Sequence, residues 1–145
     1  MRTLEFTLPQ ATPSNNQLLR MHWRKRRAVK KQLAMEVAAA LVRSGQRRPN
    51  EPLAQVYIEI ERGSAGELDD DNLQGGTKLL VDVLEKPSRT NPHGLGLIEN
   101  DNNQCVVKRR VTQALAKRGQ GYTRVLIAEV LEDNCEFSSR FGGAQ

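Results

Sequence analysis

The spacing of apolar residues changes several times along this chain, and these changes limit the folds that it can adopt. Apolar and polar residues alternate over Thr3–Leu8 and again over Leu53–Glu61, which predicts two strands. Between them, apolar residues recur every four positions, which predicts a helix over Arg24–Arg43 carried by the stripe Val29, Leu33, Val37 and Leu41. Pro9–Asn16 is rich in Pro, Ser and Asn and is expected to be a loop.

The second half of the chain predicts one more helix and two more strands, over Thr77–Lys86, Cys105–Val111 and Thr123–Leu131. The resulting order, β-α-β-α-β-β, is typical of an α+β domain with one mixed sheet and helices packed against it. We expect a single domain over residues 1–133. Residues 134–145 are polar and are expected to form a flexible tail.

Length and composition exclude several classes of protein. A chain of 145 residues provides about one domain. No apolar run approaches the ~20 residues that a membrane-spanning helix needs, and Met1–Leu8 does not have the pattern of a secretory leader. Cys105 and Cys135 do not make a disulfide framework, and their spacing to His22 and His93 matches no zinc finger. We therefore expect a protein of a reducing cytoplasm, without a membrane partner.

The net charge of +5 is distributed very unevenly. Arg20–Lys31 holds seven basic residues in twelve positions, and no acidic residue occurs between Phe6 and Met35. Another acid-free stretch runs from Asn102 to Ala128 and holds six basic residues. Two such stretches favour a polyanionic partner such as nucleic acid. The residues expected to share a face and to contact DNA are Arg20, Arg24, Arg27 and Lys31 on a helix, and Lys108 and Arg110 on a strand.

Four of the five residues in Glu67–Asp71 are acidic, which is unusual in a basic chain. If this segment is extended, Asp69 and Asp71 point to the same side and repel each other. A hard divalent cation such as Mg²⁺ or Mn²⁺ would remove that repulsion, and Asp101 could supply a third carboxylate. A solvated loop or a helix N-terminal cap remains an alternative. A calcium-binding EF-hand loop is excluded, because Leu73, Gln74 and Leu80 occupy required positions.

Several motifs together resemble the RusA family of Holliday junction resolvases, over roughly Leu4 to Val130. They occur in the family's order: Leu8-Pro9, Pro13-Ser14-Asn15-Asn16, Arg20, Asp69-Asp70-Asp71-Asn72-Leu73, Lys78 with Leu80, Asp82 and Leu84, and Gly96-Leu97-Ile98 followed by Asp101. One spacing departs from the short family form. The lysine lies seven residues after the second Asp instead of four, and Gly75 and Gly76 lie in the added segment.

The resemblance implies a Mg²⁺-dependent, homodimeric endonuclease of phages and prophages that cuts four-way DNA junctions. The family's catalytic and metal-binding carboxylates correspond to Asp69, Asp71 and Asp101, and its catalytic lysine corresponds to Lys78. In this interpretation one or two divalent ions, Mg²⁺ or Mn²⁺, activate the attacking water. Paired symmetric nicks need two active sites related by a two-fold axis, which a homodimer provides.

Two other functions remain open at the level of sequence. A non-catalytic nucleic-acid-binding regulator could use the basic run Arg20–Lys31 alone. A related nuclease could prefer flaps or forks, because the metal chemistry is the same. Trp23 lies within the basic run, where it could stack on an unpaired base or anchor the helix to the core.

Overall fold

Four strands and four helices make up the part of the chain that the structure, a computed structural model, describes, namely residues 2–131. The expected tail, 134–145, and Cys135 lie outside these residues. The elements in chain order are β1 (Thr3–Leu8), α1 (Asn15–Arg20), α2 (Trp23–Arg43), β2 (Val56–Ser64), α3 (Asp70–Gly75), α4 (Lys78–Leu84), β3 (Val106–Leu115) and β4 (Tyr122–Glu129).

The strands form one mixed sheet in the order β1-β4-β2-β3. β4 pairs antiparallel with β1 and β2, whereas β2 pairs parallel with β3. Parallel neighbours need a crossover connection, and here that connection carries α3 and α4. The α+β fold with a mixed sheet that the sequence predicted is therefore confirmed.

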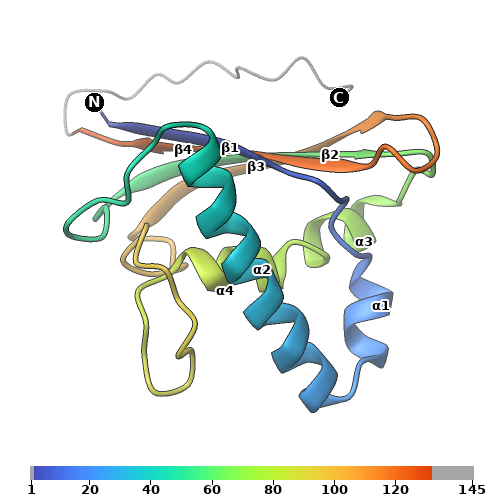
Figure 1. Cartoon of the computed structure of the whole chain (residues 1–145), viewed down its shortest axis with the longest axis horizontal. Helices are drawn as coiled ribbons and strands as arrows, with labels where there is room; N and C mark the ends of the chain where they lie inside the picture. Colours follow the sequence, from blue (N-terminus) through green and yellow to red (C-terminus); the bar gives the residue numbers. More distant parts are fainter. Residues whose placement is uncertain (1, 132–145) are drawn as a thin grey trace.

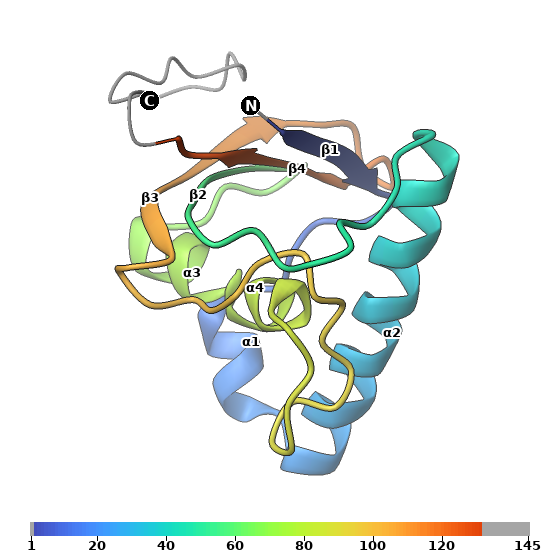
Figure 2. The same cartoon turned by 90° about the vertical axis from the view of Figure 1, so that its left-hand side faces the viewer.

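The helices lie together on one side of the sheet, as Figures 1 and 2 show. Between the two layers is the main core, which includes Phe6, Val37, Leu41, Ile58, Ile60, Leu80 and Leu84. α2 provides its predicted apolar stripe, with Leu33, Val37 and Leu41 buried. Within residues 2–131, no helix has both the length and the apolar character needed to cross a membrane.

Helix α1 begins at the end of the segment Pro9–Asn16 that was expected to be a loop, and it continues to Arg20, where no element was predicted. Its N-cap is Ser14, whose side chain accepts a hydrogen bond from the Gln17 backbone, while the Gln17 side chain accepts one from the Ser14 backbone. This capping box is readable as the pattern Ser-x-x-Gln, but the surrounding Pro and Asn residues favoured a loop.

The central strand β2 is buried on both faces. Strand alternation places Tyr57 and Glu59 on the face opposite Val56 and Ile58, and on that face they are only 2% and 0% exposed. The Tyr57 hydroxyl donates a hydrogen bond to Glu59 Oε2 at 2.9 Å. Burial, followed by this carboxylate, raises the pKa of Tyr57 to about 12.

Gly75 and Gly76 allow the segment before α1 to approach the junction of α3 and α4. A Cβ on Gly76 would lie 1.9 Å from the carbonyl oxygen of Pro13, and one on Gly75 would lie 2.5 Å from Cγ of Asn15. The Asn16 backbone N–H donates to Asn72 Oδ1 at 2.9 Å across the same contact. The glycine pair thus brings together two motifs that are more than fifty residues apart in sequence.

We expect Gly76→Ala to lower the free energy of unfolding by about 1–3 kcal/mol, because backbone atoms on both sides must move to admit a methyl group. Urea denaturation measures this change. Gly66→Ala is the matched control, because a Cβ there meets nothing within 4 Å, and its stability should be unchanged or slightly higher. Equal effects of the two substitutions would contradict the close approach at Gly76.

Candidate functional site

Three carboxylates come together at the end of α4. Asp82 and Glu85 are three residues apart on the same side of this helix, and Asp101 lies in the loop before β3. One oxygen from each side chain lies within 4.8 Å of the others. All three residues are partly buried. We refer to Asp82, Glu85 and Asp101 as the acidic trio.

Burial of α4 dictates where its charged residues lie. Leu79, Leu80, Val81, Val83 and Leu84 are all buried in the core, with exposures of 5% or less. Only one narrow strip of the helix remains for polar groups, and it carries Lys78 and Asp82, followed by Glu85 at the C-cap. The i, i+4 spacing of Lys78 and Asp82 places them on neighbouring turns.

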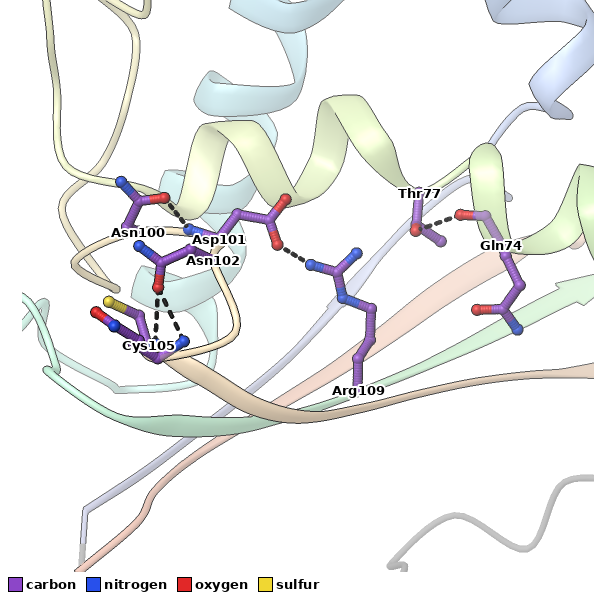
Figure 3. A network of polar contacts seen from close by, with 8 residues as sticks. Gln74, Thr77, Asn100, Asp101, Asn102, Cys105 and Arg109 are labelled. Carbon is purple, nitrogen blue, oxygen red and sulfur yellow. Dashed lines mark hydrogen bonds and ion pairs between the residues drawn. The ribbon is translucent and has the colours of Figure 1, made fainter.

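The loop that carries Asp101 is tied to the C-terminal end of α4. Leu97 and Ile98 donate backbone hydrogen bonds to the Leu84 carbonyl at 2.9 and 3.0 Å, and Gly96 donates one to the Glu85 carbonyl at 3.0 Å. Asn100 Oδ1 then accepts from the Asp101 backbone at 2.7 Å, as Figure 3 shows. The Gly96-Leu97-Ile98 motif therefore positions Asp101 close to Asp82 and Glu85.

Two cations from other elements accompany the acidic trio. Lys30 Nζ of α2 lies 3.5 Å from Asp82 Oδ2, with both side chains largely buried. Arg109 of β3 donates to Asp101 Oδ1, and Figure 3 shows its guanidinium group directed at that carboxylate. Arg109 pairs in register with Ile58, so it lies on the helix-covered face of the sheet. With all three carboxylates ionised, this group of three acids and two cations carries a net charge of −1 and is only partly exposed to solvent.

Burial and charge both act on the trio's ionisation. Burial raises the pKa of Glu85, the Asp82 carboxylate raises it further, and Lys30 and Arg109 oppose both effects. Burial also lowers the pKa of Arg109, against the attraction of Asp82 and Glu85. A divalent cation bound here would favour the ionised form of Glu85 and would remove the repulsion between the carboxylates.

Asp69 and Asp71, the other two predicted metal ligands, do not join Asp101 in this structure. Of the two alternatives left open by the sequence, the extended segment does not occur, because α3 begins at Asp70 and the two-residue alternation of a strand does not apply. Asp69 is the N-cap, and its Oδ1 accepts from the Asn72 backbone at 2.9 Å and from Asn72 Nδ2 at 3.0 Å. Asp71 is exposed in the first helical turn. The cap alternative therefore describes Asp69.

A cation-lined cavity of about 530 Å³ adjoins the acidic trio and shares Asp82 with it. It lies among α1, α2, α4 and the loop that follows α4. Its basic side chains are Arg26, Arg27, Lys30, Lys78 and Arg89. Lys78, the predicted catalytic lysine, thus lines this cavity one helical turn before Asp82, a carboxylate that was not predicted as a site residue.

The predicted DNA-contacting residues are divided between two surfaces. Arg27 lines the cavity, but Arg20, Arg24 and Lys31 do not, and all four are exposed. The expectation that all four share one helix is wrong for Arg20, because Arg20 is the last residue of α1 and α2 begins at Trp23. Lys108 and Arg110 line a separate hollow beside Glu67 and Asp70. Glu85, Arg89 and Arg109 were not predicted from the sequence as site residues. The three-residue spacing of Asp82 and Glu85 on a predicted helix is the signal that could have indicated the first of these.

No family model and no curated protein matches this chain. The resemblance to the RusA family therefore depends on the sequence motifs alone.

We expect Mn²⁺ or Mg²⁺ to stabilise the protein through the acidic trio. A metal concentration of 100 times Kd should raise the melting temperature by roughly 5–10 °C, because the ion binds only the folded state. Thermal unfolding of Asp82→Asn and Asp101→Asn should show little of this shift. Asp71→Asn, an exposed position outside the trio, is the matched control. Loss of the shift in Asp71→Asn together with its retention in Asp82→Asn would instead favour the ligands that the sequence predicted.

The raised pKa of Glu85 also predicts a pH dependence of stability. In EDTA the folded protein binds this proton more tightly than the unfolded chain, so ionising Glu85 costs stability as the pH rises through its folded-state pKa. Glu85→Gln should therefore be more stable than the parent at pH 8. At pH values below about 4.3, the ordinary pKa of Glu, this difference should disappear. Urea denaturation at both pH values measures it, with Glu51→Gln at an exposed position as the control for loss of one charge. A Glu85→Gln variant less stable than the parent at pH 8 would contradict this prediction.

Proposed function

We propose that this protein is a divalent-metal-dependent DNA endonuclease of the RusA family, which resolves four-way junctions by paired nicks. The observation that best supports the proposal is the junction of a carboxylate cluster with a cation-lined cavity through Asp82. Hydrolysis of a phosphodiester needs both features side by side, because the metal site must be adjacent to the groups that bind the phosphate.

The donor set of the acidic trio fits Mg²⁺ or Mn²⁺. Carboxylate oxygens are the preferred ligands of these hard cations, and the three side chains are close enough to share an ion. Asp82, Glu85 and Asp101 would hold the metal. The family resemblance also implies Asp69 and Asp71 as ligands, but in this structure both lie outside the trio. When bound, the ion supplies charge neutralisation and lowers the pKa of the attacking water.

The cations of the cavity would position the DNA backbone. Lys78 begins α4 one turn before Asp82, so it could bind the phosphate that is cut as a compact positive charge. Arg27 and Arg89 would bind neighbouring phosphates, since guanidinium groups contact phosphate through two parallel hydrogen bonds. Arg109 holds Asp101 in place from the opposite side.

A homodimer follows from the proposed reaction, because two nicks in opposed strands need two sites related by a two-fold axis. The motif resemblance supports the same assembly. It also supports four-way branched DNA as the substrate and the cytoplasm of a bacterial host as the compartment.

A regulator that binds nucleic acid without cutting it is the second candidate. The exposure of Arg20, Arg24 and Lys31 along one basic run favours it, because such a surface binds phosphates without any metal. The two candidates differ in their dependence on the acidic trio. Binding alone would survive the loss of a carboxylate, whereas cleavage would not.

Cleavage of a labelled immobile four-way junction tests the proposal, with linear duplex and flap substrates as controls. With Mg²⁺ we expect paired nicks in opposite arms, which EDTA abolishes. Asp101→Asn should reduce the rate about 100-fold or more, because metal binding contributes several kcal/mol to transition-state stabilisation. Asp101 is the best target because it belongs both to the trio and to the ligand set that the resemblance implies.

Asp70→Asn is the matched control for this experiment. Asp70 is exposed and belongs to neither ligand set, and within residues 2–131 its side chain accepts one hydrogen bond, from the nearby Gln74 side chain at 3.3 Å. This variant should cut at nearly the parental rate. Junction binding without cleavage in Mg²⁺ and Mn²⁺ would reject the endonuclease proposal and favour the regulator. Cleavage of flaps in preference to junctions would keep the nuclease and change its substrate.

A further inference from the structure

We propose that the cation-lined cavity binds one unstacked nucleotide of DNA, with its base against Trp23 and its phosphate among the basic side chains. The choice of DNA as the partner rests on the proposed function. The binding mode rests on the cavity itself, and it adds to that function a site for an unpaired base.

Trp23 has the placement of a stacking platform. It is the first residue of α2, it lines the cavity, and it is 61% exposed. The alternative considered from the sequence, a tryptophan that anchors the helix in the core, does not agree with this exposure. The Arg24 guanidinium lies 5.3 Å from the centre of the indole ring. A base that stacks on the ring would gain both the aromatic surface and a nearby positive charge.

The cavity combines apolar surface with strong positive charge. Leu19, which is 68% exposed, lines it together with Trp23, and the lining includes five basic side chains. The lining includes one acidic residue, Asp82, and its charge is compensated by Lys30 at 3.5 Å. A ligand that fits such a lining is apolar and flat at one end and anionic at the other. A nucleotide has this form, and about 530 Å³ lies within the usual size range of small-ligand pockets.

Arg26 adds an unused hydrogen-bond donor at the same place. Its Nη2 donates to the Leu18 carbonyl at 2.5 Å, which holds the guanidinium beside α1. Its Nε is buried and has no hydrogen-bond partner among the described residues. Buried donors normally have partners, so an acceptor such as a phosphate or a base carbonyl is a natural complement.

Stacking on Trp23 requires a base that is not already stacked within a duplex. In a continuous duplex each base is stacked between its neighbours, so none is free to lie on Trp23. A base at a branch point or in a single strand is free to do so at little cost. Since the cavity shares Asp82 with the acidic trio, this nucleotide would lie close to the phosphodiester that the proposed enzyme cuts.

Intrinsic fluorescence provides a direct test, because Trp23 is the single tryptophan of the chain. The full-length protein is titrated in EDTA with an eight-nucleotide oligothymidylate, with thymidine monophosphate and with a blunt duplex of mixed sequence. We expect strong, saturable quenching by the oligonucleotide and weak quenching by the mononucleotide, which carries fewer phosphates. Quenching by the mononucleotide as strong as that by the oligonucleotide would assign the cavity to free nucleotides. Equal quenching by the duplex, or none by the oligonucleotide, would overturn the proposal.

Fluorescence anisotropy of a labelled oligothymidylate then tests the residues. Trp23→Ala should weaken binding about 5-fold or more, which is the usual effect of removing a stacking ring, and Trp23→Phe should restore part of it. Arg89→Ala should weaken binding more than Arg48→Ala. Both arginines are exposed and both changes remove one positive charge, but only Arg89 lines the cavity. Equal effects of the Arg89 and Arg48 substitutions, with no effect at Trp23, would show that binding is only electrostatic and would overturn the proposal.

This test is independent of cleavage, because it is made without metal. If the protein cuts junctions but the oligonucleotide does not change Trp23 fluorescence, the proposed function is supported and this inference is rejected. If the protein binds single strands through Trp23 but cuts no DNA, the nucleotide site is supported and the endonuclease proposal is rejected.

Discussion

The burial of α4 is the constraint on which the arrangement of the candidate site depends. Five of the seven residues of this helix are buried, so its charged groups are confined to one strip that faces away from the core. Asp82 and Glu85 are consequently only partly solvated, and unpaired carboxylates in such a position are unfavourable. Lys30 of α2 pairs with Asp82, and the charges of Lys30 and of Arg109 of β3 both favour the ionised form of Glu85. The same charges that could serve a reaction therefore also connect the helical layer to the sheet, and hydrophobic packing determines where they meet.

The departure from the short family motif has a structural explanation. The chain from Asp70 to Leu84 forms two helices, α3 and α4, which are joined at Gly76 and Thr77. Thr77 is buried, and its hydroxyl donates to the Gln74 carbonyl at 2.8 Å. The absence of side chains at Gly75 and Gly76 lets the Pro13–Asn16 segment pack directly on this junction. Lys78 then begins a new helix and lines the cavity, so the longer spacing is compatible with a lysine beside the carboxylates.

The sequence predicted most of the fold but only part of the site. Local periodicity identified β1 and α2 to within one residue, because each buries one face on a regular repeat. The helical spacing of the basic run also singled out Arg27, and the acidic pattern and the motif resemblance singled out Asp101 and Lys78. All three residues belong to the trio or line the cavity. The sequence did not indicate that Asp82 and Glu85 would join Asp101. Their proximity arises in the folded chain, where the Gly96–Ile98 segment hydrogen-bonds to the end of α4. The acidic run was more conspicuous in sequence, but its first carboxylate caps α3, and this local hydrogen bonding outweighed the expected extended geometry.

The charge balance of the trio helps to separate a functional role from a structural one. A carboxylate in a partly buried position is stabilised when a cation pairs with it, and one left without a cation is unfavourable. Here three carboxylates face two cations, and the pKa of Glu85 is raised. Under the proposed function, a bound divalent ion would offset the excess negative charge of the trio. It would also weaken the attraction of the carboxylates for Lys30 and Arg109. Lys30 also lines the cavity, so its release would strengthen phosphate binding there. Metal and DNA would then favour each other's binding, and this coupling must be reciprocal.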